Sequence, residues 1–107
     1  MYELVKDDTA TQIKATLTRD VDGSAIDCSG GAVRLYFRKK GSTTILSTLT
    51  AVDTGTNLQN GIAIFSFGAG DLNVQPGYYE GEIEITFDDG TVESVYETLD
   101  FKVRADF

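Results

Sequence analysis

The sequence predicts an all-β protein, an antiparallel two-sheet immunoglobulin-like β-sandwich of seven to eight strands. Three observations support this prediction. Apolar residues recur at every second position through most of the 107-residue chain, as in strands with one buried and one solvated face. No segment keeps the 3.6-residue period of an amphipathic helix. Turn residues, mainly Gly, Asp and Asn, separate the alternating segments at short intervals, which is typical of sandwiches, with a small closed barrel as the alternative.

Four segments alternate clearly enough to assign an inward face. They are residues 12–18, 32–39, 78–87 and 99–104. Each places apolar side chains on one face and mostly polar or charged side chains on the other, so we expect each to be a strand with its apolar face in the core. The inward residues are Ile13, Ala15 and Leu17; Val33, Leu35 and Phe37; Tyr79, Ile83, Ile85 and Phe87; and Leu99, Phe101 and Val103.

Four further segments are expected to be strands with weaker faces. Residues 2–6 form a short N-terminal strand, residues 44–52 are rich in Thr, Ile and Leu, and residues 61–67 are apolar on both faces. Residues 91–96 follow a hairpin turn at Asp88-Asp89-Gly90, in which the glycine can adopt the positive φ that such turns require.

Length and composition limit the class of protein. A chain of this length has room for one ordinary domain, so residues 1–107 are expected to form a single immunoglobulin-like domain. Nine Lys and Arg against 17 Asp and Glu give a net charge of -8, which disfavours binding to nucleic acid or to an anionic membrane surface. The chain contains no histidine, which excludes an imidazole base or a histidine metal ligand. The first residues lack the basic and apolar regions of an export signal, so secretion is not expected.

The charge is distributed unevenly along the chain. Residues 1–40 carry 7 Lys and Arg and 6 Asp and Glu, whereas residues 41–107 carry 2 and 11. In an immunoglobulin-like strand order, the strand with Arg34 and Arg38 lies beside the glutamate-rich strand of residues 78–87. We therefore expect opposite charges to pair across these two strands, each pair contributing about 0.2–1 kcal/mol.

Few residue patterns point to catalysis. Cys28 has no histidine to activate it, and the adjacent Asp27 raises the pKa of its thiol, so we expect a structural thiol. Three glutamates share one strand face, but a continuous strand indicates a solvated face rather than the cleft that a glycosidase needs. These glutamates are Glu80, Glu82 and Glu84.

Two acidic turns could in principle bind a metal ion. Asp7-Asp8 and Asp88-Asp89-Gly90 both supply carboxylates, but neither has the residue spacing of a calcium-binding loop. Asp-Gly is also the sequence that a tight hairpin favours for backbone reasons. We therefore expect no enzyme activity, no catalytic residues, no cofactor-binding residues and no metal site.

One apolar strand face indicates a contact with another protein. In residues 61–67, placing Phe65 and Phe67 in the core leaves Ile62 and Ile64 on the outside. An exposed apolar strand face often marks an interface. The alternative is that a loop of the same chain covers it.

A basic run at the end of one strand is the second candidate contact. Arg38-Lys39-Lys40 stands in an otherwise acidic protein. It can dock against an acidic region of a neighbouring copy or of a different subunit, or it can be a solvated strand end. The candidate interface residues are therefore Ile62, Ile64, Arg38, Lys39 and Lys40.

Several sequence motifs follow one another in a recognisable order. Residues 6–17 read KDDTATQIKATL, residues 22–38 read DGSAIDCSGGAVRLYFR, residues 60–65 read NGIAIF, and residues 76–90 read PGYYEGEIEITFDDG. In this order the motifs resemble the immunoglobulin-like domain at the N-terminus of phage upper baseplate proteins. Cys28 stands where that family usually has a hydrophobic residue, and Gly31 is an additional residue in its turn.

The resemblance implies a bacteriophage virion structural protein without enzyme activity. It suggests a domain that docks on other virion subunits, as a tail or baseplate adaptor or as a capsid decoration (cement) protein. It also implies assembly in the bacterial host cytoplasm, in many copies or as a homo-oligomer on a symmetric particle. The alternative is a module that binds carbohydrate on the host surface, with tyrosines that stack on sugars; these would be Tyr36, Tyr78, Tyr79 and Tyr96.

Overall fold

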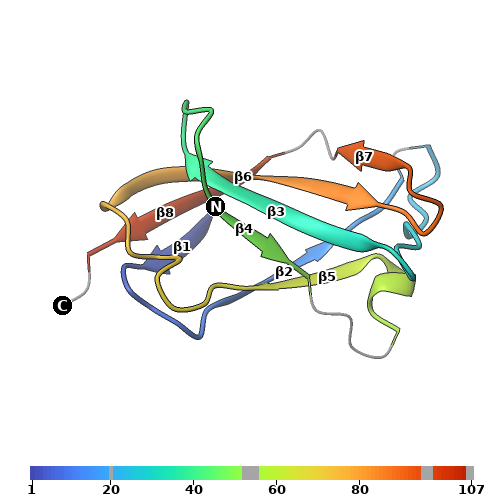
Figure 1. Ribbon diagram of the computed structural model, residues 1–107, viewed down its shortest axis with the longest axis horizontal. Helices are drawn as coiled ribbons and strands as arrows, with labels where there is room; N and C mark the ends of the chain where they lie inside the picture. The colour runs from blue at the N-terminus through green and yellow to red at the C-terminus, as the bar shows by residue number, and fades with distance from the viewer. Residues whose placement is uncertain (20, 52–55, 95–97, 106–107) are drawn as a thin grey trace.

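The protein folds into two β-sheets that pack against each other, as the computed structural model in Figure 1 shows. The structure describes residues 1–19, 21–51, 56–94 and 98–105. The larger sheet has the strand order β1-β8-β6-β3-β4, with β7 also paired to β6, and the smaller sheet consists of β2 and β5. The strands are β1 (Tyr2–Val5), β2 (Gln12–Thr16), β3 (Ala32–Lys39), β4 (Ile45–Thr50), β5 (Ile62–Ser66), β6 (Gly77–Thr86), β7 (Val92–Ser94) and β8 (Leu99–Arg104).

This arrangement confirms the predicted immunoglobulin-like sandwich. The chain forms two separate sheets, so the alternative of a closed barrel is wrong. The predicted strands agree with the observed ones to within one or two residues at each end, and β3 and β8 match their predicted bounds. Three residues of the predicted strands lie outside the described residues, namely Val52, Val95 and Tyr96.

One strand pairing differs from the predicted antiparallel arrangement. β1 runs parallel to β8, with Tyr2 opposite Phe101 and Leu4 opposite Val103. Leu4 is buried in the core. Alternation predicts that Leu4 points into the core whether β1 runs parallel or antiparallel to its neighbour. The sequence pattern of β1 therefore does not indicate the direction of its pairing.

A turn of 3-10 helix, η1 (Leu58–Asn60), precedes β5. Leu58 is buried, and Gly61 ends the turn with a positive φ of 73°. Among the described residues, no helix is long and apolar enough to cross a membrane.

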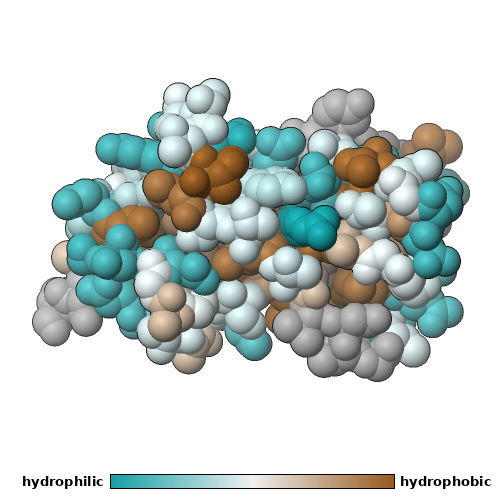
Figure 2. All heavy atoms as spheres, in the orientation of Figure 1, coloured by the Kyte–Doolittle hydropathy of each residue, from teal (hydrophilic) through white to brown (hydrophobic). Residues whose placement is uncertain are grey.

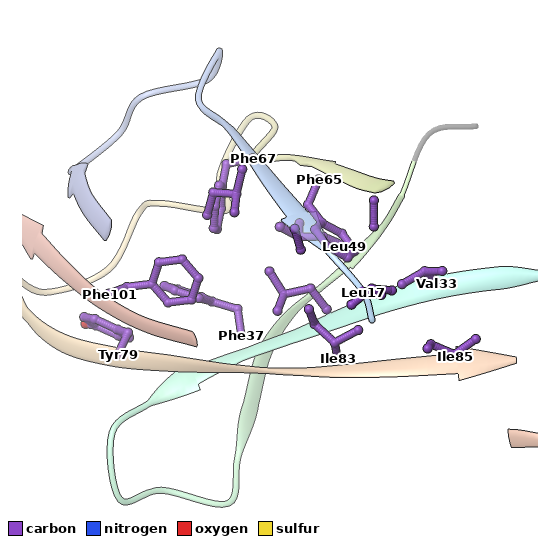
Figure 3. Close-up of a cluster of buried hydrophobic side chains, with 14 of the residues drawn as sticks. Leu17, Val33, Phe37, Leu49, Phe65, Phe67, Tyr79, Ile83, Ile85 and Phe101 are labelled. Carbon is purple, nitrogen blue, oxygen red and sulfur yellow. The ribbon is translucent and has the colours of Figure 1, made fainter. Parts of the chain in front are cut away.

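The core lies between the two sheets and is organised around Phe37 (Figure 3). The Phe37 ring stacks on Tyr79 with 5.1 Å between the ring centroids. It also meets Phe67 and Phe101 edge to face, at 5.4 and 5.5 Å. Such aromatic pairs add about 0.5–1.5 kcal/mol beyond the burial of their area. Since these rings come from β3, β6, β8 and the residue that follows β5, the cluster joins both sheets.

Two glycines allow close approaches that a side chain would prevent. A Cβ atom on Gly81 would lie 2.6 Å from Leu35 Cδ1 and 3.0 Å from Phe101 Cε2, inside the core. A Cβ atom on Gly31 would lie 2.0 Å from the carbonyl oxygen of Thr86. The additional glycine of that turn therefore lets the chain pass close to the end of β6 before β3 begins.

Candidate functional site

The outer face of the larger sheet carries a row of charged side chains from β3 and β6. Arg38 Nε donates to Glu80 Oε1 at 2.9 Å, and Arg38 Nη1 donates to Glu82 Oε2 at 3.3 Å. The hydrogen bond to Arg38 is the main cause that lowers the pKa of Glu80. The predicted pairing of arginine with glutamate across these strands is confirmed for Arg38.

Arg34 uses a different partner from the one predicted. It lies opposite Glu84 in the strand register, but its Nη1 lies 3.5 Å from Thr86 Oγ1. Glu84 instead accepts a hydrogen bond of 3.0 Å from the Tyr36 hydroxyl. Burial is the first cause of the raised pKa of Tyr36, and this contact with Glu84 adds to it. The outer face is thus a network in which most of the carboxylates already have partners.

The basic run at residues 38–40 is divided between three environments. Arg38 is half-buried in the pairs with Glu80 and Glu82. Lys39 lies on the inner side of β3, because side chains alternate along a strand, and it lines a groove at the end of the sandwich. Lys40 is exposed, with its Nζ atom 3.7 Å from Asp100 Oδ1. The run does not form one continuous basic patch.

The groove has a volume of about 470 Å³. It lies between the inner end of the larger sheet, the segment that leads into β4, and the loop before β6. Two lysines line it and no carboxylate does. The lining residues are Lys6, Lys39, Ser42, Thr44, Leu46, Asn73, Val74, Gln75 and Tyr79.

The two isoleucines of β5 lie on the outer face of the smaller sheet. Ala63, Phe65 and the following Phe67 are buried, whereas Ile62 and Ile64 are half-buried. Their neighbours across the sheet are Thr16 and Lys14, both exposed. The faces of this strand are therefore as predicted, with the isoleucines partly accessible on the outside.

A further accessible apolar surface lies over the start of β4, where Figure 2 shows brown spheres near the hairpin between β3 and β4. Ile45 is 42% exposed and Leu46 is 48% exposed. Sequence reasoning missed this surface because the inward set of residues 44–52 was ambiguous. The sequence did contain one signal for this surface, which is the scarcity of charge. Asp53 is the only charged residue between Lys40 and Asp71.

The thiol of Cys28 is a structural group in this fold. Cys28 is 1% exposed, and its Sγ atom lies 3.5 Å from the carbonyl oxygen of Ile26. Burial is the main cause that raises the pKa of this thiol, and the adjacent Asp27 raises it further.

Several carboxylates in the loops accept hydrogen bonds from residues of the same turn. Asp89 Oδ1 accepts hydrogen bonds from the backbone N–H and the hydroxyl of Thr91, at 2.9 and 2.7 Å, and Gly90 has the expected positive φ of 88°. Asp22 and Asp27 bind Ser24 and Ser29 in the same way. In the described part of the chain, no three Cys, Asp or Glu side chains lie close enough together to hold a metal ion.

The tyrosines considered for carbohydrate stacking do not share one surface. Tyr79 is 3% exposed in the core, and its hydroxyl donates to the carbonyl oxygen of Gln75. Tyr36 is half-buried, and Tyr78 is exposed with Lys102 Nζ 5.9 Å from the centre of its ring. Tyr96 lies outside the described residues.

Among the comparisons with known proteins, only the one with solved structures found matches. No family model matches the chain, and no curated protein matches it. Among solved structures, the fold is similar to the N-terminal domain of phage TP901-1 ORF48, with a TM-score of 0.60 and 16% identity, over 100% of this chain and 85% of that one. It is also similar to CopC from Methylosinus trichosporium OB3b, with a TM-score of 0.53 and 9% identity, over 98% of this chain and 86% of that one. At these identities the likeness shows a shared β-sandwich fold.

Proposed function

We propose that this protein is a non-enzymatic structural component of a bacteriophage virion. In this proposal it docks on other virion subunits, as a tail or baseplate adaptor or as a capsid decoration protein, while the virion is assembled in the host cytoplasm. The observation that carries the proposal is the likeness, over the whole chain, to a domain of a phage protein. The motifs at residues 6–17, 22–38, 60–65 and 76–90, which in this order resemble the N-terminal domain of phage upper baseplate proteins, support the same proposal.

The distribution of charge supports a docking role for the side of the sandwich formed by β4 and β5. The outer face of β3 and β6 is a network of ion pairs and hydrogen bonds, whereas β4 and β5 contain no charged residue. The centres of protein interfaces are depleted in charged residues. Ile62 and Ile64 supply accessible apolar groups on the outer face of the smaller sheet, and Ile45 and Leu46 supply others at the start of β4.

Incorporation into particles tests the proposal. We expect the protein to copurify with phage particles through a density gradient and to give symmetric density in a cryo-EM map. Ile62→Asp with Ile64→Asp should leave the fold intact and reduce the number of copies per particle. Absence of the wild-type protein from purified particles would refute the virion role.

A matched control separates this effect from added charge. Val21 and Val92 are 97% and 60% exposed, so Val21→Asp with Val92→Asp adds the same two charges away from β5. This control should enter particles normally. If the isoleucine variant is soluble, folded and incorporated as well as the control, the face of β5 is not the interface.

A further inference from the structure

We propose that the free edge of β4 accepts an extended segment of a partner protein as an added strand, with a carboxylate of that segment held between Lys6 and Lys39. This inference rests on the proposed docking function and states how the partner is held. The segment that fits is largely uncharged, with an acidic residue at the end that reaches the groove.

The edge of β4 has the chemistry that strand addition requires. β4 is the terminal strand of the larger sheet and, among the described residues, pairs only with β3. An edge strand presents a row of backbone N–H and C=O groups, and proteins usually protect such edges with charges, proline, short length or a bulge. The bulge of β4 is confined to Leu46, at the start of the strand. β4 has six residues without charge or proline. Its four residues from Ser47 to Thr50 pair with β3 in regular register.

The other edges of the larger sheet are protected in the usual way. β1 has four residues and includes Glu3, and β7 has three residues and includes Glu93. A charged side chain on a short edge disfavours the approach of another strand. Within the described part of this sheet, β4 is therefore the edge with the least protection against strand addition.

Leu46 connects this edge to the groove. The register of β4 shifts here, because Ser47 lies opposite Phe37 while Ile45 lies opposite Arg38, which leaves Leu46 as an additional residue. Such a bulge bends a strand and changes the direction of a side chain. Leu46 is 48% exposed and lines the groove together with Thr44. A strand that runs along β4 therefore ends at the groove.

The groove provides a place for a negative charge. Lys6 and Lys39 line it, and its other lining residues are uncharged. A carboxylate accepts charge-assisted hydrogen bonds from ammonium groups. Leu46, Val74 and Tyr79 supply apolar contacts for the stem of an acidic side chain.

The net charge favours a partner segment over a second copy of this chain. Two copies that each carry a charge of -8 repel one another. An uncharged strand with one or two carboxylates at its end avoids most of this repulsion and still uses the two lysines.

The test is a titration of the 15N-labelled protein with two synthetic peptides, followed by NMR. The probe is acetyl-Glu-Thr-Val-Thr-Val-Glu-amide, which brings a Glu to the groove in either strand direction, and its control has Lys in place of both Glu residues. We expect the Glu peptide to shift the amide signals of β4 and of Lys39, with an affinity that falls as salt rises. Lys39→Glu should weaken binding about tenfold or more. Lys14→Glu, which changes the same charge on an exposed position of the smaller sheet, should not.

Several outcomes would overturn the inference. These are no shift at millimolar peptide, equal binding of the Lys peptide, or equal effects of Lys39→Glu and Lys14→Glu. Sedimentation that shows a concentration-dependent dimer, lost in Leu46→Lys, would assign the edge to a second copy instead. Because particle incorporation is measured separately, a protein that copurifies with particles but binds no peptide leaves the proposed function standing and removes this inference alone.

Discussion

Arg38 on β3 and Glu80 on β6 form an ion pair of 2.9 Å on the outer face of the larger sheet, where both side chains are about four-fifths buried (20% and 17% exposed). Replacing Arg38 with Glu should lower the midpoint of thermal unfolding by several degrees. The change removes two ion pairs and places a third carboxylate beside Glu80 and Glu82, and like charges on neighbouring strands destabilise a sheet.

Two comparisons check this explanation. Lys14→Glu makes the same change of charge on the smaller sheet and should have little effect. Adding Glu80→Arg to Arg38→Glu should recover part of the lost stability, because the ion pair forms again with its charges exchanged. A double variant no more stable than Arg38→Glu alone would contradict the pairing.

The stability contributed by Glu80 should depend on pH. Arg38 lowers the pKa of Glu80 in the folded protein, so the pair stabilises the fold above the ordinary pKa of glutamate, about 4.3. The contribution is lost as pH falls through the lower folded pKa. The free energies of unfolding of the wild type and of Glu80→Gln, measured with urea, should therefore differ at pH 7, and the difference should shrink as the pH falls below the ordinary pKa of glutamate. An unchanged difference between the two proteins would count against this prediction.

The Cys28 thiol should be inert in the folded protein. It is buried, and its pKa is raised mainly by that burial, so modification requires opening of the structure. A colorimetric thiol reagent should react orders of magnitude more slowly in buffer than in denaturant. The control is Cys28→Ala with Ser29→Cys, which moves the thiol to the exposed neighbouring position and should react at once. Fast reaction of the wild type would show that the core around Cys28 opens readily.

Gly81→Ala should destabilise the protein by about 1–3 kcal/mol, the usual cost of inserting atoms into a packed core. The added methyl group would lie 2.6 Å from Leu35 Cδ1, so Leu35 or Phe101 must move. Gly68→Ala is a suitable control, since its Cβ would have its nearest neighbour at 3.6 Å. Equal denaturation midpoints for the two variants would mean that the core adapts without cost.

The sequence pattern was sufficient to predict the buried face of each strand, and insufficient to predict the direction in which β1 pairs or the side chain that Arg34 contacts. Alternation placed Phe37, Ile83 and Phe101 inside and Arg38 and Glu80 outside, because burial of one strand face repeats every two residues. The order of strands then brought Arg38 to Glu80 as expected. The direction of β1 and the choice of Thr86 as the partner of Arg34 depend on geometry that the alternation does not contain.

In the candidate site, too, alternation along a strand predicted some features, and others depend on how the strands are arranged in space. Ile62 and Ile64 lie on the predicted outer face, since that prediction required only alternation along β5. Lys39 was grouped with Arg38 and Lys40 because they are adjacent in sequence, yet adjacent residues of a strand point to opposite faces. The groove joins Lys6, Lys39 and Asn73, which are far apart in the chain. Such a site becomes visible only when the fold brings these residues together.

The parallel pairing of β1 with β8 has a consequence for how the chain folds during synthesis. Leu4 meets Val103, so the first strand cannot take its place in the larger sheet until residues 99–104 have left the ribosome. The central strands β3 and β6 can pair before β8 is synthesised. Until β8 is available, the other side of β6 lacks that partner. Contacts between residues so distant in sequence slow folding. Within this domain, β1 therefore has no partner while the residues between it and β8 are synthesised, and the larger sheet is completed only when β8 is available.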